Sequence, residues 1–168
     1  MNKLTPTLLN AEDFAPFGEI IDLRTAKTQA INYGLTTRYH DLATVDTANQ
    51  DGRTLINVFR SNPITLPHQV AVMERHPLGS QAFIPTGQNP FLVLVGLGET
   101  TLETDSLKLF ITDGRQGVNY FTNTWHHYQM VLGSSADFVV IDRGGPGDNL
   151  EEVHLQDGPW IELEATGV

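Results

Sequence analysis

Two short segments hold the side chains of this sequence that are best suited to acid–base or metal chemistry. The first contains Glu74 and His76, and Gln81 follows after a Pro-Leu-Gly-Ser turn. Residues two apart on a strand point to one face, so Glu74 and His76 should lie together, with Gln81 on the next strand. The second segment contains His126. These four side chains are our candidate catalytic residues, and they are also our candidate ligands for a divalent cation such as Ni²⁺, Mn²⁺, Fe²⁺ or Zn²⁺.

A metal-free alternative stays open, in which Glu74 and His76 simply pair inside a polar interior. Because an amide is a weak ligand, we expect any metal to bind with modest affinity and to be lost on dialysis. His127 directly follows His126 and should face the opposite way, as a surface or interface histidine. Arg75, between Glu74 and His76, should for the same reason point away from the site, to a surface or an interface.

Arginine is the side chain best suited to capture a carboxylate, because its guanidinium donates two parallel hydrogen bonds. The formal net charge of the chain is −10, so the overall field repels anions and individual arginines must attract an anionic substrate. Arg38, Arg60 and Arg143 are the candidates for substrate binding. Arg143 precedes two glycines, whose backbone a ligand can approach closely. Arg60 should lie either at the mouth of a barrel or on its outside. For each of the three, an ordinary surface charge is the alternative.

The composition argues against several classes of function. The chain has no cysteine, which excludes disulfides, thiolate catalysis and zinc–thiolate sites and is compatible with the cytoplasm, where we expect the protein. The acidic balance argues against nucleic acids and anionic membranes as partners. The N-terminus lacks the apolar run of a signal peptide, and the longest apolar stretch, 91–97, is too short to span a bilayer.

The elements that must position these side chains are mostly short strands. Asn10 is a typical N-cap and predicts one short helix that ends before Gly18. Strand-like runs separated by turns follow at 55–60, 70–74, 81–85, 91–95, 117–121, 129–132 and 138–141. Residues 107–111 could form a strand or a short helix, and the chain from Gly144 onward should be a turn and an acidic surface tail. We therefore predict one all-β domain over 1–168, a sandwich or barrel with a few short helices.

The spacing Glu74-x-His76-x₄-Gln81 resembles the first metal-binding motif of the cupins, with Glu replacing the first His and Gln replacing the Glu. His126 occupies the place of the histidine in the second cupin motif, although the usual Pro and Gly are missing. This resemblance implies a cupin-like double-stranded β-barrel that brings the four candidate residues together.

Over nearly its whole length the chain resembles the ureidoglycolate lyase family. The segments that carry the resemblance, in the family's order, are 38–42, 75–85, 116–120, 125–127 and 141–145. The resemblance implies a cupin-type barrel, a homodimer, a cytoplasmic role in allantoin and purine-nitrogen breakdown, and activity linked to nickel without an organic cofactor. The implied reaction splits a small molecule, (S)-ureidoglycolate, into glyoxylate and urea.

Such a cleavage needs a base for the substrate hydroxyl, an acid for the departing urea nitrogen, and a cation or donors for the developing charge. His76 or His126 can be the base, and Glu74 can be the acid or an orienting group. Gln81 can donate to the urea carbonyl or complete a metal shell. Two alternatives remain: an amidohydrolase that releases ammonia, and a non-catalytic cupin that binds a small carboxylate. The clustering of titratable groups argues against the second.

Overall fold

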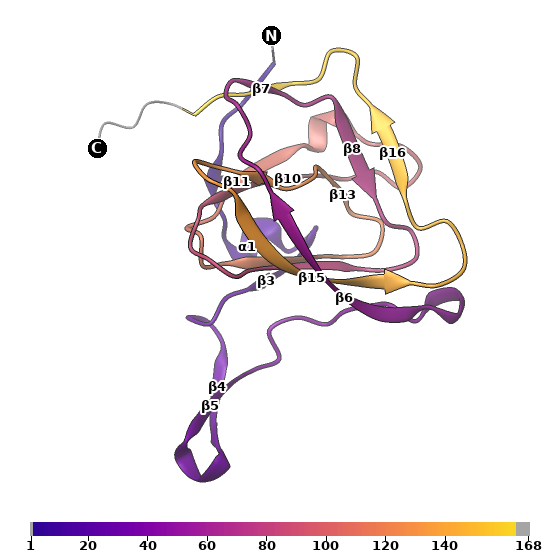
Figure 1. Ribbon diagram of the computed structural model, residues 1–168. Coiled ribbons are helices and arrows are strands. Elements are labelled where there is room, and N and C mark those ends of the chain that lie inside the picture. The colour runs from indigo at the N-terminus through magenta and orange to yellow at the C-terminus, as the bar shows by residue number, and fades with distance from the viewer. Residues whose placement is uncertain (1, 164–168) are drawn as a thin grey trace.

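A computed structural model describes residues 2–163, and within them the chain folds into two main β-sheets that face each other (Figure 1). The seven-stranded sheet contains β2 (Thr7–Leu8), β8 (Val72–Arg75), β10 (Phe91–Gly96), β11 (Lys108–Ile111), β13 (Trp125–His126), β14 (Met130–Val131) and β16 (Glu151–His154). The five-stranded sheet contains β3 (Gly18–Ile21), β6 (Arg53–Ser61), β9 (Gln81–Pro85), β12 (Gly117–Tyr120) and β15 (Ala136–Gly144).

The strand order in the first sheet is β16-β8-β13-β10-β11-β2, with β14 also paired to β10, and in the second it is β3-β12-β9-β15-β6. Two smaller sheets are formed by β1 (Lys3–Leu4), β17 (Trp160–Ile161) and β7 (His68–Gln69), and by the hairpin of β4 (Lys27–Ile31) and β5 (Thr36–His40). The helical elements are α1 (Ala11–Phe14) and the 3₁₀ turns η1 (Asn32–Gly34), η2 (Asn49–Asp51) and η3 (Thr104–Ser106). The predicted all-β, cupin-like class is confirmed, as a sandwich whose two main sheets do not close into a barrel.

The helix and most strands lie where the sequence predicts them. In α1, the Asn10 side chain accepts a hydrogen bond from the backbone N–H of Asp13 at 3.0 Å, as expected of an N-cap. Residues 108–111 form a strand, which resolves the ambiguity over 107–111. After Gly144 the predicted turn and exposed acidic residues are present, but the prediction missed a strand, because β16 pairs with β8 along the edge of the seven-stranded sheet. The side chains of β16 are largely exposed, so its acidic residues stay in water while its backbone pairs.

The apolar core lies on both sides of β10. All six residues of β10 are buried. Phe91, Val93 and Val95 belong to the cluster that includes Phe14, Phe110 and Phe138, whereas Leu92 and Leu94 pack in a second cluster with Trp125 and Ile161. The period-two alternation of a strand covered on both faces therefore divides the core into two halves. None of the helices in residues 2–163 has the length and apolar character needed to cross a membrane.

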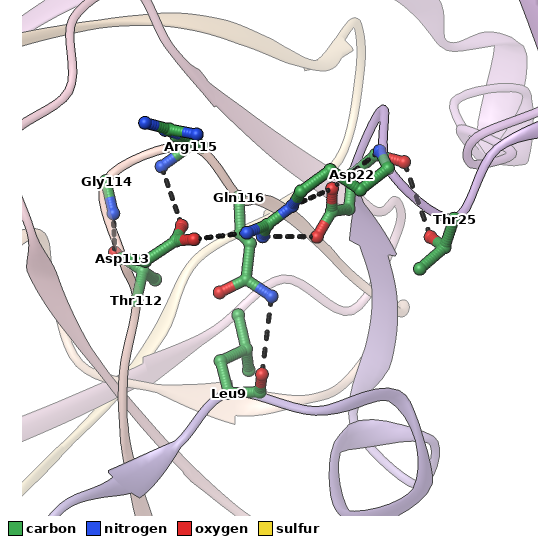
Figure 2. A network of polar contacts seen from close by, with 9 residues as sticks. Leu9, Asp22, Thr25, Thr112, Asp113, Gly114, Arg115 and Gln116 are labelled. Carbon is green, nitrogen blue, oxygen red and sulfur yellow. Dashed lines mark hydrogen bonds and ion pairs between the residues drawn. The ribbon is translucent and has the colours of Figure 1, made fainter.

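The β4–β5 hairpin projects from the body of the protein (Figure 1). We call residues 27–40, which include η1, the arm. At its base the Arg24 guanidinium forms ion pairs with Asp22 at 2.7 Å and with Asp113 at 2.5 Å, within the polar network of Figure 2. Hydrogen bonds from Arg24 lower the pKa of the Asp22 carboxyl. This network anchors the start of the arm to the turn that precedes β12.

Candidate active site

Glu74, His76 and His126 lie together, each offering one ligand atom within 4.8 Å of the others. Glu74 lies on β8, and His76 comes directly after this strand. His126 on β13 is paired directly opposite Glu74, so the two side chains share one face of the sheet. Strand alternation and cross-strand register thus produce the cluster.

Both histidines leave one ring nitrogen without a partner. The Nδ1 of His76 lies 2.6 Å from the carbonyl oxygen of Asn149, so this nitrogen donates and Nε2 keeps its lone pair. The Nδ1 of His126 lies 3.3 Å from the carbonyl oxygen of His127 and 3.8 Å from Oε1 of Glu74. Both Nε2 atoms are buried and make no hydrogen bond in the described residues. Buried polar atoms are normally paired, so these two lone pairs indicate a site for a ligand or a proton.

The surroundings of His126 hold it in the neutral form. Its side chain is 1% exposed and stacks on the ring of Tyr120, with centroids 4.2 Å apart and planes 7° from parallel. Burial, helped by repulsion from His76, lowers the pKa of His126 to about 3. Burial also raises the pKa of Glu74, although the charge of His76 opposes this shift. The cluster therefore combines a neutral imidazole with a carboxyl group that holds its proton more readily than usual.

Gln81 lies on the facing sheet. It is paired opposite Tyr120, so these two side chains share a face, and Tyr120 in turn stacks on His126. The Gln81 amide donates through Nε2 to Oδ2 of Asp142 at 3.4 Å, while its Oε1 is buried and has no partner in the described residues. Asn57 donates to the other oxygen of Asp142 at 2.9 Å. In this orientation Gln81 offers the oxygen Oε1 to a ligand as an acceptor.

The donor set fits a divalent cation. Two imidazole nitrogens and an amide oxygen are buried without partners, and the carboxylate of Glu74 lies within reach of both histidines. Mixed nitrogen and oxygen ligands of this kind suit Ni²⁺, Mn²⁺, Fe²⁺ or Zn²⁺. The residues present therefore allow the predicted metal site without fixing the identity of the metal.

A cavity of about 280 Å³ opens onto Glu74. Its other lining residues are Phe59, Ser61, Asn62, Ile64, Phe83, Tyr128 and Gln129. The amide nitrogen of Gln129 is buried without a partner among the described residues, so it is a free donor. One carboxylate, two amides and two hydroxyls on a mainly apolar wall suit a small polar molecule. No arginine or lysine of residues 2–163 lines this cavity.

The structure does not bring the three predicted substrate-binding arginines to this cavity. The Arg38 side chain is exposed on the arm and makes no hydrogen bond or ion pair in the described part of the chain. Arg60 lies on the outside, with Nε and Nη2 each 2.8 Å from an oxygen of Asp137. Arg143 is buried and donates to the backbone carbonyls of Asn49, Gln50 and Pro146. Within one chain, the positions of Arg60 and Arg143 support structural roles.

Two surface predictions are wrong. Arg75 points away from the cluster as expected, but it is buried, with its guanidinium 4.6 Å from the ring centroid of Trp125. His127 is also buried, with its ring centroid 5.4 Å from that of His68. The reason is the same for both. The far side of the seven-stranded sheet carries the second apolar cluster and is covered by other segments of the chain.

Sequence reasoning missed Tyr120, Asp142 and Asn57, which surround the predicted residues. One pattern could have found Asp142. Phe138 and Val140 on β15 are buried and alternate with less buried neighbours, so Asp142 continues the inward face of the strand. A carboxylate at an inward position of an apolar strand indicates a partner or a function.

Comparison with known proteins agrees with this geometry. Residues 1–162 match the family model described as ureidoglycolate lyase. A ureidoglycolate lyase of Burkholderia mallei (strain NCTC 10229) is 46% identical over 165 residues, which cover 98% of this chain and 96% of the relative. One of Brucella anthropi is 46% identical over 158 residues, covering 94% and 92%. Ureidoglycolate lyase 1 of Rhizobium meliloti (strain 1021) is 47% identical over 149 residues, covering 89% and 87%. The chain belongs to the ureidoglycolate lyase family.

Proposed function

We propose that this protein is a carbon–nitrogen lyase that cleaves (S)-ureidoglycolate into glyoxylate and urea. The observation that carries the proposal is the cluster of Glu74, His76 and His126, whose ligand atoms lie within 4.8 Å of one another and whose Glu74 lines a small cavity. The names of the relatives, which align over almost the whole chain, supply the substrate.

One carbon of ureidoglycolate carries a hydroxyl, a carboxylate and a nitrogen of urea. A base removes the hydroxyl proton, the C=O bond forms as the C–N bond breaks, and an acid protonates the departing nitrogen. No water is consumed. We assign the base to Nε2 of His76, because the Asn149 carbonyl fixes its tautomer and burial makes His126 a weak proton acceptor. The raised pKa of Glu74 suits it to be the acid.

Glu74, His76, Gln81 and His126 would also hold a divalent cation, which supplies positive charge near the oxygen that becomes the aldehyde of glyoxylate. Metal binding and proton transfer compete at both residues, because a ligating His76 has no free lone pair and a ligating Glu74 has no proton to donate. Whether the reaction requires the metal is therefore decided by assaying metal-free and metal-loaded protein side by side.

We expect metal-free protein to bind about one equivalent of Ni²⁺ or Mn²⁺ weakly, since one ligand is an amide. Glu74→Gln should weaken this binding by roughly tenfold or more, because it removes the only anionic ligand. The matched control is Glu152→Gln, which removes an exposed carboxylate paired opposite Glu74. Isothermal titration calorimetry measures all three proteins. Equal weakening in both variants would show that general charge, and not coordination, governs binding.

The main alternative is an amidohydrolase, which attacks the ureido carbonyl with water and releases ammonia. Product analysis separates the two reactions: the lyase yields urea and glyoxylate in equal amounts, whereas the hydrolase yields ammonia without urea. Failure to consume freshly prepared substrate, with or without metal, would favour a module that only binds a small carboxylate.

We further propose that the protein acts as a cytoplasmic homodimer, with the chain 1–168 forming one catalytic domain. The family resemblance supports the dimer. Light scattering at micromolar concentration tests the dimer, and cell fractionation tests the location.

A further inference from the structure

Within residues 2–163 the arm is left almost entirely exposed. In β4 and β5 every residue is exposed except Ile31, which is half-buried. Tyr33 at the tip is fully exposed and Leu35 is 90% exposed. An isolated two-stranded hairpin is only marginally stable in water, and exposed aromatic and aliphatic side chains add to the cost. The arm therefore needs a surface to pack on.

The outer face of the five-stranded sheet is such a surface. On β6, Ile56 is 75% and Val58 is 66% exposed, and they are paired opposite the half-buried Ile141 and Val139 of β15. We call these four residues the outer patch. The inner face of the same sheet already packs in the core, and β6 is an edge strand with one unpaired side. An apolar outer face beside an open edge favours association with another chain.

The arm rises from this same outer face. Residues paired directly across neighbouring strands point to the same face of a sheet. Asn119 of β12 pairs with Ala82 of β9, and Ala82 pairs with Ile141 of the outer patch, so Asn119 lies on the outer face. The Asn119 amide donates to the carbonyl of Thr44, just after the arm, at 3.0 Å. A chain that covers the outer patch therefore also lies beside the arm.

Charge indicates that the partner is a second copy of this chain. The arm contains Lys27 and Arg38 and no acidic residue. With histidine neutral, the rest of the chain carries a formal −12, which is the −10 of the whole less the +2 of the arm. The basic arm of one copy is complementary in charge to the acidic body of another copy. In a dimer with a two-fold axis, each arm can pack on the body of its partner at the same time.

The same edge strand borders the active-site cavity. Phe59 and Ser61, which alternate with the outward Val58 and Arg60, line the cavity from β6. A second copy that packs on β6 and crosses its edge reaches the cavity mouth. Among the described residues no cation lines the cavity to meet the substrate carboxylate, and the Arg38 side chain on the arm has no anionic partner. We propose that the arm of each copy docks across β6 of its partner and completes the partner's active site with Arg38. The catalytic part of this inference rests on the proposed function.

The docking part is tested without substrate. The double substitution Tyr33→Ser with Leu35→Ser removes the apolar tip, so we expect a dimer by light scattering for the wild type and a monomer for this variant. Leu8→Ser, which replaces an exposed leucine outside the arm, is the control and should remain dimeric. A wild-type monomer, or a tip variant that dimerises as well as the wild type, would overturn the proposal.

The catalytic part is tested by mixing two defective proteins. Arg38→Ala should lower kcat/KM for ureidoglycolate by roughly ten- to a hundredfold, mainly through KM, as expected for loss of a charged hydrogen-bond pair. Arg115→Ala, at an exposed arginine outside the arm, should leave it unchanged. His76→Ala should retain about one hundredth of the wild-type activity or less. Hybrid dimers of Arg38→Ala with His76→Ala contain one intact site, so an equal mixture should recover about a quarter of wild-type activity.

No recovery in proven hybrid dimers would show that Arg38 does not act across the interface. If the wild type produces neither urea nor glyoxylate, the proposed function fails. The light-scattering experiment then still tests whether the arm docks on a second copy. The two failures are therefore distinguishable.

Discussion

Replacing His76 or His126 by Ala is expected to lower the turnover of ureidoglycolate by roughly a hundredfold or more. The hydroxyl proton must leave while the C–N bond breaks, and Nε2 of His76 is the fixed lone pair available to take it. His126 acts with it, because its buried imidazole stacks on Tyr120 and lies opposite Glu74. Loss of either ring should reduce kcat, whereas binding of glyoxylate, held mainly by its carboxylate, should weaken much less.

The control for this prediction is His154→Ala, which removes an exposed histidine on β16. Urea and glyoxylate are measured together under single-turnover conditions. If His76→Ala retains near-normal kcat, the base is another group. If the products are ammonia without urea, the lyase itself is refuted.

The candidate cluster could be predicted from sequence because it depends on short-range geometry. Glu74 lies on β8 and His76 follows its last residue, so period-two alternation, continued one residue beyond the strand, is enough to predict that they share a face. His126 was harder to place, since β13 has only two residues and no alternation of its own. Its position follows from pairing with β8, and in the sequence only the motif resemblance pointed to it.

The roles of the three arginines could not be assigned from the sequence, because the acceptors that a guanidinium binds are brought to it by the tertiary fold. Arg60 meets Asp137, 77 residues away, and Arg143 meets the carbonyl of Asn49, 94 residues away. Local patterns contain no information about such partners. The arm was missed for a different reason: its strands are largely polar and exposed, so neither face shows an apolar alternation.

The edge strand β16 was not predicted from the sequence, because its side chains are largely exposed and show no apolar alternation. The acidic run of β16 looks like a surface tail, yet its backbone pairs with β8 through four residues, and Glu152 lies opposite Glu74. This strand also affects the site, since repulsion from Glu152 contributes to the raised pKa of Glu74. A charged edge strand is a common protection against further strand pairing, which explains why its composition resembles that of a loop.

The largest stability effect outside the apolar core is expected at Arg75. Its guanidinium lies over Trp125, donates to the backbone carbonyls of Gly98 and Glu99, and pairs with Glu151 at 2.6 Å. Arg75→Ala empties the space over Trp125 and removes the ion pair with Glu151 and the donor to the Glu99 carbonyl, whereas the Gly98 carbonyl keeps its hydrogen bond from the Trp125 indole. We expect the free energy of unfolding to fall by about 2 kcal/mol, mainly through lost packing and the lost contact with the Trp125 ring, and Tm to fall by roughly 4–8 °C for a chain of this size.

Arg60→Ala is the matched control for this loss, because Arg60 also makes a two-point contact with a carboxylate, that of Asp137, but on the exposed surface. Exposed ion pairs contribute only about 0–1 kcal/mol, so its Tm should change little. Both variants are compared by thermal and urea unfolding. The two arginines differ mainly in burial. Equal shifts in Tm would show that the ion pair, and not the burial of Arg75 against Trp125, determines the contribution of Arg75 to stability.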